Sequence, residues 1–153
     1  FSWNLDGESG SMPISLLEAG GCEGVQGNQL IDGNWYDPGR SGFGYDINSY
    51  PGLETMLAYL YDGKGQARWL QAVRERSASL GGTASLPLLQ LQGSCPLCSY
   101  SNTTGHEVGA LSRRYNTPTS GELEIDVQFR APVPGSWSQD TPIQMLTDPR
   151  SCH

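Results

Sequence analysis

The sequence is poor in basic residues and in long apolar runs, and both shortages exclude classes of partner. Only 9 Lys and Arg stand against 16 Asp and Glu in 153 residues, which gives a formal net charge of −7. Arg113 and Arg114 are adjacent, but the other basic residues are scattered, so there is no basic stripe. An acidic surface repels phosphate, which makes nucleic acid and anionic membranes poor partners. No apolar run approaches the roughly 18–20 residues of a membrane-spanning helix, so we expect no membrane span.

Hydrophobic residues (37%) and charged residues (16%) are also scarce, whereas 20 Gly and 10 Pro fill much of the remainder. These residues interrupt helices and favour turns, so we expect many short strands rather than long helices. The length fits one domain. We expect an irregular N-terminal arm over residues 1–27 and a β domain over residues 28–153.

Four cysteines occur, Cys22, Cys95, Cys98 and Cys152. An even number of cysteines predicts disulfides and an oxidising compartment. Three pairings are possible, and we favour Cys95–Cys98 with Cys22–Cys152. The second bond would close a loop over most of the chain and stabilise it by roughly 4–5 kcal/mol on the chain-entropy model.

Two other kinds of chemistry use cysteine at this spacing. Cys95 and Cys98 have the C-x-x-C spacing of thioredoxin-like redox sites, which lie at a helix N-terminus. Here the pair follows an apolar, strand-like run and precedes a Ser/Thr/Asn/Gly loop, in which we also place His106. Zinc held by cysteines with His106 and His153 would normally need a second paired motif, which the chain lacks. We therefore favour disulfides and predict no metal and no cofactor.

The clearest strand pattern covers residues 121–129, where apolar and polar residues alternate without interruption. A period of two buries one face of a strand and exposes the other. Pro87 removes a hydrogen-bond donor from its segment, which predicts an edge strand or a bulge there. Further strands are predicted over residues 29–36, 42–48, 55–61, 66–74 and 83–92, with a last strand that begins at Trp137 or Ile143 and ends at Leu146.

Short connections join these strands, and the segment at residues 62–65, Asp-Gly-Lys-Gly, predicts a tight hairpin turn. About six to eight strands result. We therefore predict an all-β fold, an antiparallel up-and-down barrel or a sandwich, because these architectures leave few strand edges exposed.

Two segments carry a resemblance. Residues 33–47 read Gly-Asn-Trp-Tyr-Asp-Pro-Gly-Arg-Ser-Gly-Phe-Gly-Tyr-Asp-Ile, and residues 59–70 read Tyr-Leu-Tyr-Asp-Gly-Lys-Gly-Gln-Ala-Arg-Trp-Leu. Together they resemble a group of secreted bacterial β domains with the motif G-x-W-Y-x-P-x-x-S-G-x-G followed by Y-D-x-x-G-x-x-x-W. The resemblance implies export and a β architecture, and it implies no particular activity. The chain begins with Phe1 rather than Met, which fits a processed product that is secreted, extracellular or periplasmic.

A second resemblance rests on Gly33, Asn34 and Trp35, which are similar to the G-x-W opening of calycins, the barrels that include avidins and lipocalins. It implies a ligand in the mouth of a barrel.

Aromatic residues are the main candidates for ligand binding. They offer large apolar faces with polar edges, which suits the stacking of sugar rings or an apolar pocket. The alternative is that they form the core and cross-strand pairs. Trp35 and Tyr36 must point to opposite faces of a regular strand, so one of them should be more exposed. The candidate ligand-binding residues are Trp35, Tyr36, Tyr45, Tyr59, Tyr61 and Trp69.

Asp37, Asp46 and Asp62 lie beside these aromatics. Paired carboxylates perform acid–base catalysis on glycosidic bonds, and carboxylates also bind Ca²⁺. In Asp-Pro and Asp-Gly contexts, however, Asp is more often a turn residue. We therefore predict an extracellular, non-catalytic binding or structural module that recognises a glycan or a neighbouring subunit of a surface assembly. The alternatives are a calycin-like carrier of a small ligand and a glycan-acting hydrolase.

Overall fold

The fold is all-β in a computed structural model of the chain, with ten strands and no helix among the residues that it describes. These residues are 2–5, 7–11, 13–14, 31–50, 53–75, 82–93, 98–131 and 134–147. Within them, no helix is long and apolar enough to span a membrane.

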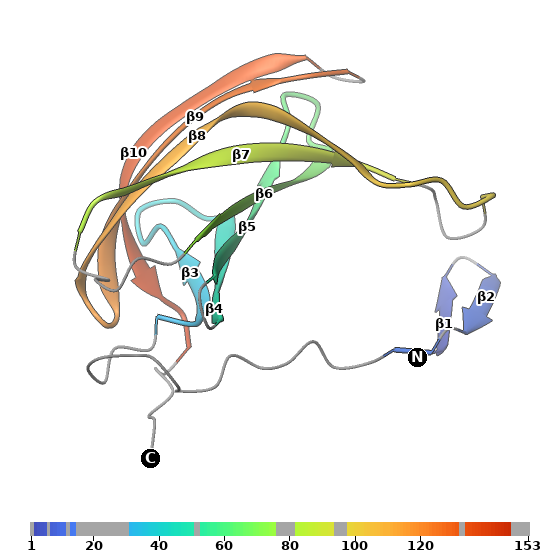
Figure 1. The fold of residues 1–153 in the computed structure, drawn as a ribbon, viewed down its shortest axis with the longest axis horizontal. Helices are drawn as coiled ribbons and strands as arrows, with labels where there is room; N and C mark the ends of the chain where they lie inside the picture. Colours follow the sequence, from blue (N-terminus) through green and yellow to red (C-terminus); the bar gives the residue numbers. More distant parts are fainter. Residues whose placement is uncertain are drawn as a thin grey trace.

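Eight antiparallel strands close into a barrel in the order β10-β3-β4-β5-β6-β7-β8-β9 (Figure 1). Strands that follow one another in sequence are neighbours in the barrel, so the topology is up-and-down and the predicted fold class is confirmed. The strands are β3 (Gly33–Tyr36), β4 (Gly44–Tyr50), β5 (Leu53–Tyr61), β6 (Ala67–Glu75), β7 (Ala84–Gln92), β8 (Thr104–Thr117), β9 (Ser120–Phe129) and β10 (Gly135–Met145).

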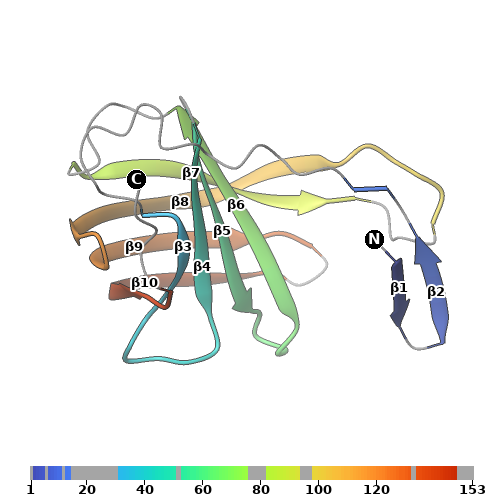
Figure 2. The ribbon, with the colours of Figure 1, turned by 90° about the horizontal axis from the view of Figure 1, so that it is seen from below.

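The barrel consists of two four-stranded halves, β3–β6 and β7–β10, which cross steeply in Figure 2. Two short ladders join the halves. Strand β6 pairs with β7 only over Leu70, Gln71 and Ala72, and β10 pairs with β3 through Gln144 and Met145. The other neighbouring strands pair over longer stretches. The two corners of the barrel therefore need support from side chains.

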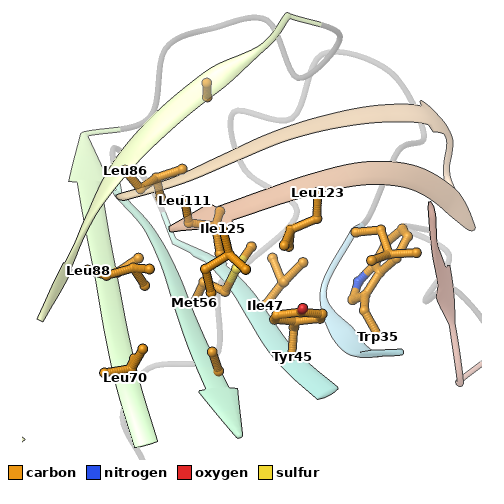
Figure 3. Packing of buried hydrophobic residues seen from close by; sticks show 14 of the residues in the cluster. Trp35, Tyr45, Ile47, Met56, Leu70, Leu86, Leu88, Leu111, Leu123 and Ile125 are labelled. Atoms are coloured by element: carbon orange, nitrogen blue, oxygen red, sulfur yellow. The ribbon is translucent and has the colours of Figure 1, made fainter. Parts of the chain in front are cut away.

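Apolar side chains fill the interior (Figure 3). In β9, Leu123, Ile125 and Val127 are buried and the residues between them are exposed, as the alternation predicts. Strand β5 alternates in the same way. An eight-stranded barrel is just wide enough for side chains to occupy its centre.

The longest strand, β8, was not predicted, and the placement of His106 in a loop was wrong. His106 lies in β8 opposite Gln90 of β7. The pairing register of β7 and β8 shifts between Leu88 and Leu89. The alternation of buried and exposed residues in β8 changes phase at this point: Val108 is buried before it, and the next buried residue is Leu111. The bulge breaks the period of two that identifies strands in a sequence.

Pro87 was predicted to mark an edge strand or a bulge, and the bulge is found one residue further on. Strand β7 has neighbours on both sides, but its ladder with β6 covers only Leu88, Leu89 and Gln90. Pro87 lies opposite Ala110 in the β8 ladder and just beyond the stretch that pairs with β6, so on that side it has no ladder partner.

The predicted irregular arm contains a regular element. Strands β1 (Ser2–Leu5) and β2 (Glu8–Ser11) form an antiparallel hairpin in a sheet of their own. Gly7 has a φ of 84°, a conformation that tight hairpin turns require and that glycine adopts at no steric cost.

The cysteine pairings stay predictions. Cys22, Cys95 and Cys152 lie outside the described residues.

A buried ion pair lies among the core side chains at one end of the barrel. Arg113 Nε donates to Glu54 Oε1 at 2.7 Å, and the Nη2 of Arg113 donates to Oε2. Arg74 Nε donates to the same Oε2 at 3.2 Å. The side chains of Arg113 and Glu54 are both fully buried.

Aromatic rings extend this cluster towards the first barrel strand. The guanidinium of Arg113 lies 4.6 Å from the centroid of the Tyr115 ring, which is 5.2 Å from that of Trp35. Trp35 Nε1 in turn donates to the Ile31 carbonyl at 2.9 Å. The cluster thus connects β3, β5, β6 and β8.

We expect Glu54→Gln to lower the free energy of unfolding by about 3–5 kcal/mol, because it leaves the buried Arg113 guanidinium without its carboxylate. Urea unfolding at neutral pH measures this. The control is Glu122→Gln, which removes an exposed partner of Arg114 and should change stability by no more than about 1 kcal/mol. Equal midpoints for the two variants would contradict a structural role of Glu54.

Candidate functional site

Strand alternation divides the six candidate aromatics between the two sides of the barrel wall. Trp35 and Tyr45 point inwards and are 1% exposed (Figure 3). Tyr36 and Tyr59 are half-buried on the outside, where Tyr61 and Trp69 are 61% and 60% exposed. The predicted opposition of Trp35 and Tyr36 is confirmed, with Tyr36 the more exposed. The six residues therefore do not form one site.

The outer four lie close together because of strand register. Tyr36 is opposite Gly44, Gly44 is opposite Tyr59, and Tyr59 is opposite Trp69, so one row crosses β3, β4, β5 and β6. Tyr61 lies two residues beyond Tyr59 on the same side of β5. We call Tyr36, Gly44, Tyr59, Tyr61 and Trp69 the outer aromatic face.

Within this face, the rings of Tyr59 and Trp69 contact each other edge to face, with centroids 4.9 Å apart and an interplanar angle of 80°. Gly44 contributes no side chain to the row between Tyr36 and Tyr59. A shallow cavity of about 190 Å³ adjoins the face and is lined in part by Gly42, Tyr59, Tyr61 and Trp69. Rings and cavity together offer apolar area that faces solvent.

Hydrogen-bonding side chains lie beside the rings. In the next row Asn34 is opposite Asp46, Asp46 is opposite Leu57, and Leu57 is opposite Gln71. Burial and the nearby Asp46 carboxylate raise the pKa of Tyr59. Stacking rings flanked by amide and carboxylate groups can hold a sugar ring by its apolar face and bond its hydroxyls.

Asp37 supports the barrel rather than an open site. Its side chain is almost fully buried. Oδ1 accepts a hydrogen bond from Gly39 N at 2.6 Å, while Oδ2 accepts from Gln139 Nε2 at 3.1 Å and Thr141 Oγ1 at 2.5 Å. These bonds join the end of β3 to β10, where the ladder is only two residue pairs long. Burial and, secondarily, Asp37 raise the pKa of Tyr45 far above its usual range.

Asp62 organises the β5–β6 turn, as its Asp-Gly context indicates. Its carboxylate accepts hydrogen bonds from Lys64 N at 2.8 Å and Gln66 N at 3.0 Å, and Arg68 Nη2 lies 2.7 Å from Oδ2. Desolvation opposes ionisation, but these hydrogen bonds and Arg68 together hold the pKa of Asp62 below its usual value. Asp62 and Asp37 thus have structural partners, and Asp46 lies on the outer side of the wall.

No group of three or more His, Cys, Asp or Glu could hold a metal ion within the described part of the chain. Four residues of the zinc site that was weighed and set aside, Cys22, Cys95, Cys152 and His153, lie outside it.

A second cavity lies at the end of the barrel that carries the β5–β6 turn. Its volume is about 380 Å³, and Phe43, Leu60, Phe129 and Trp137 provide its apolar lining. The rings of Phe43 and Trp137 are 5.7 Å apart at 67°. Phe129 and Trp137 were not predicted as site residues. Each lies near the end of a strand, and only the strand order places them beside Phe43.

The fold defines the chain as a closed, eight-stranded, antiparallel β-barrel with an apolar interior, an architecture compatible with the calycin-like barrel that Gly33, Asn34 and Trp35 indicated. No family model, no curated protein and no solved structure gives a significant match to the chain.

We expect Asp37→Asn to destabilise the barrel by about 1.5–3 kcal/mol, because hydrogen bonds to a buried charged group are lost. Chemical denaturation at neutral pH measures the change. Asp46→Asn, on the outer side, is the matched control and should stay within about 0.5 kcal/mol of the wild type. A stable Asp37→Asn variant would show that the carboxylate does not support the β3–β10 corner.

Proposed function

We propose that this chain is an extracellular, non-catalytic module that binds a glycan on its outer aromatic face. The observation that carries the proposal is the row of Tyr36, Gly44, Tyr59 and Trp69 across four paired strands. Neighbouring exposed apolar side chains mark interaction sites more often than isolated ones do. Here the rings stand on a hydrogen-bonded wall whose inner side is packed, so little order has to be gained on binding.

The two sequence motifs both contribute residues to the outer aromatic face. The G-x-W-Y-x-P-x-x-S-G-x-G segment contributes Tyr36 and Gly44, and the Y-D-x-x-G-x-x-x-W segment contributes Tyr61 and Trp69. In both segments other residues have structural roles, such as Trp35 in the core and Asp62 in the turn. Tyr36, Tyr61 and Trp69 of these segments lie instead on the outer aromatic face.

Export remains part of the proposal. An even number of cysteines and an acidic, lysine-poor composition fit an oxidising extracellular or periplasmic compartment. The hydrolase alternative is less well supported, because Asp37 and Asp62 already accept several hydrogen bonds within the barrel.

Affinity electrophoresis in gels that contain soluble neutral, amino and acidic polysaccharides tests the proposal. We expect retardation of the wild type in at least one gel and a loss of tenfold or more in affinity for Trp69→Ala, because central aromatic anchors carry most of the binding energy of a site. Tyr59→Ala should behave similarly.

The control is Tyr100→Ala, which removes an aromatic side chain that is 85% exposed in the segment before β8. It should bind like the wild type. No retardation of the wild type in any gel would overturn glycan binding, and undiminished binding by Trp69→Ala would place the site elsewhere.

A small-ligand carrier is the second candidate, and the mouth cavity favours it. A volume of about 380 Å³ with aromatic walls lies within the usual range for small-molecule sites. Packed side chains, among them Tyr45 and Met56, occupy the interior, so such a ligand would lie at the mouth rather than at the centre.

For this candidate we expect a fluorescent probe with an apolar ring system, such as anilinonaphthalene sulfonate, to bind the native protein. Trp137→Ala should weaken probe binding severalfold, whereas Trp69→Ala should leave it unchanged. Equal binding by all three proteins would rule out the mouth as the probe's site.

A further inference from the structure

We infer that the glycan bound on the outer aromatic face carries free, protonated amino groups, and that Asp46 selects them. This inference rests on the proposed glycan-binding function and adds the chemical class of the sugar. It follows from the distribution of charge on the wall formed by β3, β4, β5 and β6.

The outer side of this wall has one charged position and no basic one among its described side chains. Among the outward residues of these strands whose side chains the structure describes, Asp46 is the only ionisable acid or base apart from the tyrosines. Of the two arginines of β6, Arg74 points the other way, whereas Arg68 lines the small cavity beside Tyr59 and Trp69. Arg68 is bonded to Asp62 and Arg74 to Glu54, so neither compensates the charge of Asp46.

Asp46 lies next to the rings. It is two residues from Gly44 on the same side of β4, and its cross-strand partner Leu57 is two residues from Tyr59. After burial, the Asp46 carboxylate is the second cause that raises the pKa of Tyr59. Asn48 Nδ2 donates to Asp46 Oδ2 at 3.1 Å, which orients the carboxylate without neutralising it.

The chemistry of this arrangement favours a cation. A carboxylate attracts an ammonium group and repels a uronate, and the faces of Tyr59 and Trp69 attract ammonium through their ring quadrupoles. The net charge of −7 adds long-range attraction for a polycation. An N-acetylated sugar offers the same apolar face without the charge. A polymer of free hexosamine residues therefore fits the site better than its acetylated or acidic counterparts.

The test compares oligosaccharides of equal length by isothermal titration calorimetry at low salt and at a pH where amines are protonated. The probes are a glucosamine hexamer, an N-acetylglucosamine hexamer and a galacturonate hexamer. We expect the wild type to bind the glucosamine hexamer at least tenfold more tightly than the acetylated one, and the galacturonate hexamer most weakly.

We expect Asp46→Asn to lose about tenfold in affinity for the glucosamine hexamer and to bind the acetylated hexamer within twofold of the wild type. The control is Asp126→Asn, which removes the same charge from the outer side of β9 in the other half of the barrel. It should keep the preference for free amines.

The outcomes separate the two proposals. Equal affinity of the wild type for the free and acetylated hexamers would overturn the inference. If Trp69→Ala then weakened binding of both hexamers, the proposed glycan-binding function would still stand. An equal loss in Asp46→Asn and Asp126→Asn would also overturn it, because the attraction would then depend on net charge alone. If Trp69→Ala does not weaken binding of any hexamer, the proposed function itself fails.

Discussion

Closure of the sheet is the constraint on which the rest of this structure depends. Once β10 pairs with β3, every barrel strand has an inner and an outer side, and consecutive residues alternate between a packed interior and solvent. The closing ladder is only two residue pairs long. The buried carboxylate of Asp37 bonds across the same corner to Gln139 and Thr141, which gives this buried charged group a structural role.

The two ends of the barrel differ in how completely side chains fill them. At one end Glu54, Arg113 and Arg74 form a buried ion-pair cluster, on which Tyr115 and Trp35 pack. At the other end, aromatic side chains surround an open cavity instead of filling it. A barrel of eight strands has room for one layer of large side chains at each level. The packed levels supply rigidity, and the outer wall of β3–β6 can therefore carry exposed rings in a constant arrangement.

Much of the fold was predictable because most strands have a regular pattern. The alternation in β9, the Asp-Gly turn at Asp62 and the breaks at Gly and Pro identified most barrel strands and the all-β class. Strand β8 could not be found in this way, because a bulge shifts the phase of its alternation between Val108 and Leu111. The hairpin β1–β2 was missed because its residues lack an apolar alternation.

The sequence by itself determined the kinds of side chain available: many aromatics, few bases and an alternation that opposes Trp35 to Tyr36. It did not determine which aromatics share a surface, because cross-strand neighbours are set by register between segments that are distant in sequence. Tyr36 and Trp69 are 33 positions apart in the sequence but only three strands apart in one row. Only the closed tertiary structure decided that Trp35 and Tyr45 belong to the core and that Asp46 remains beside exposed rings. The physical reason is that burial and proximity depend on pairing between strands and on closure of the sheet, which a pattern within one strand does not specify.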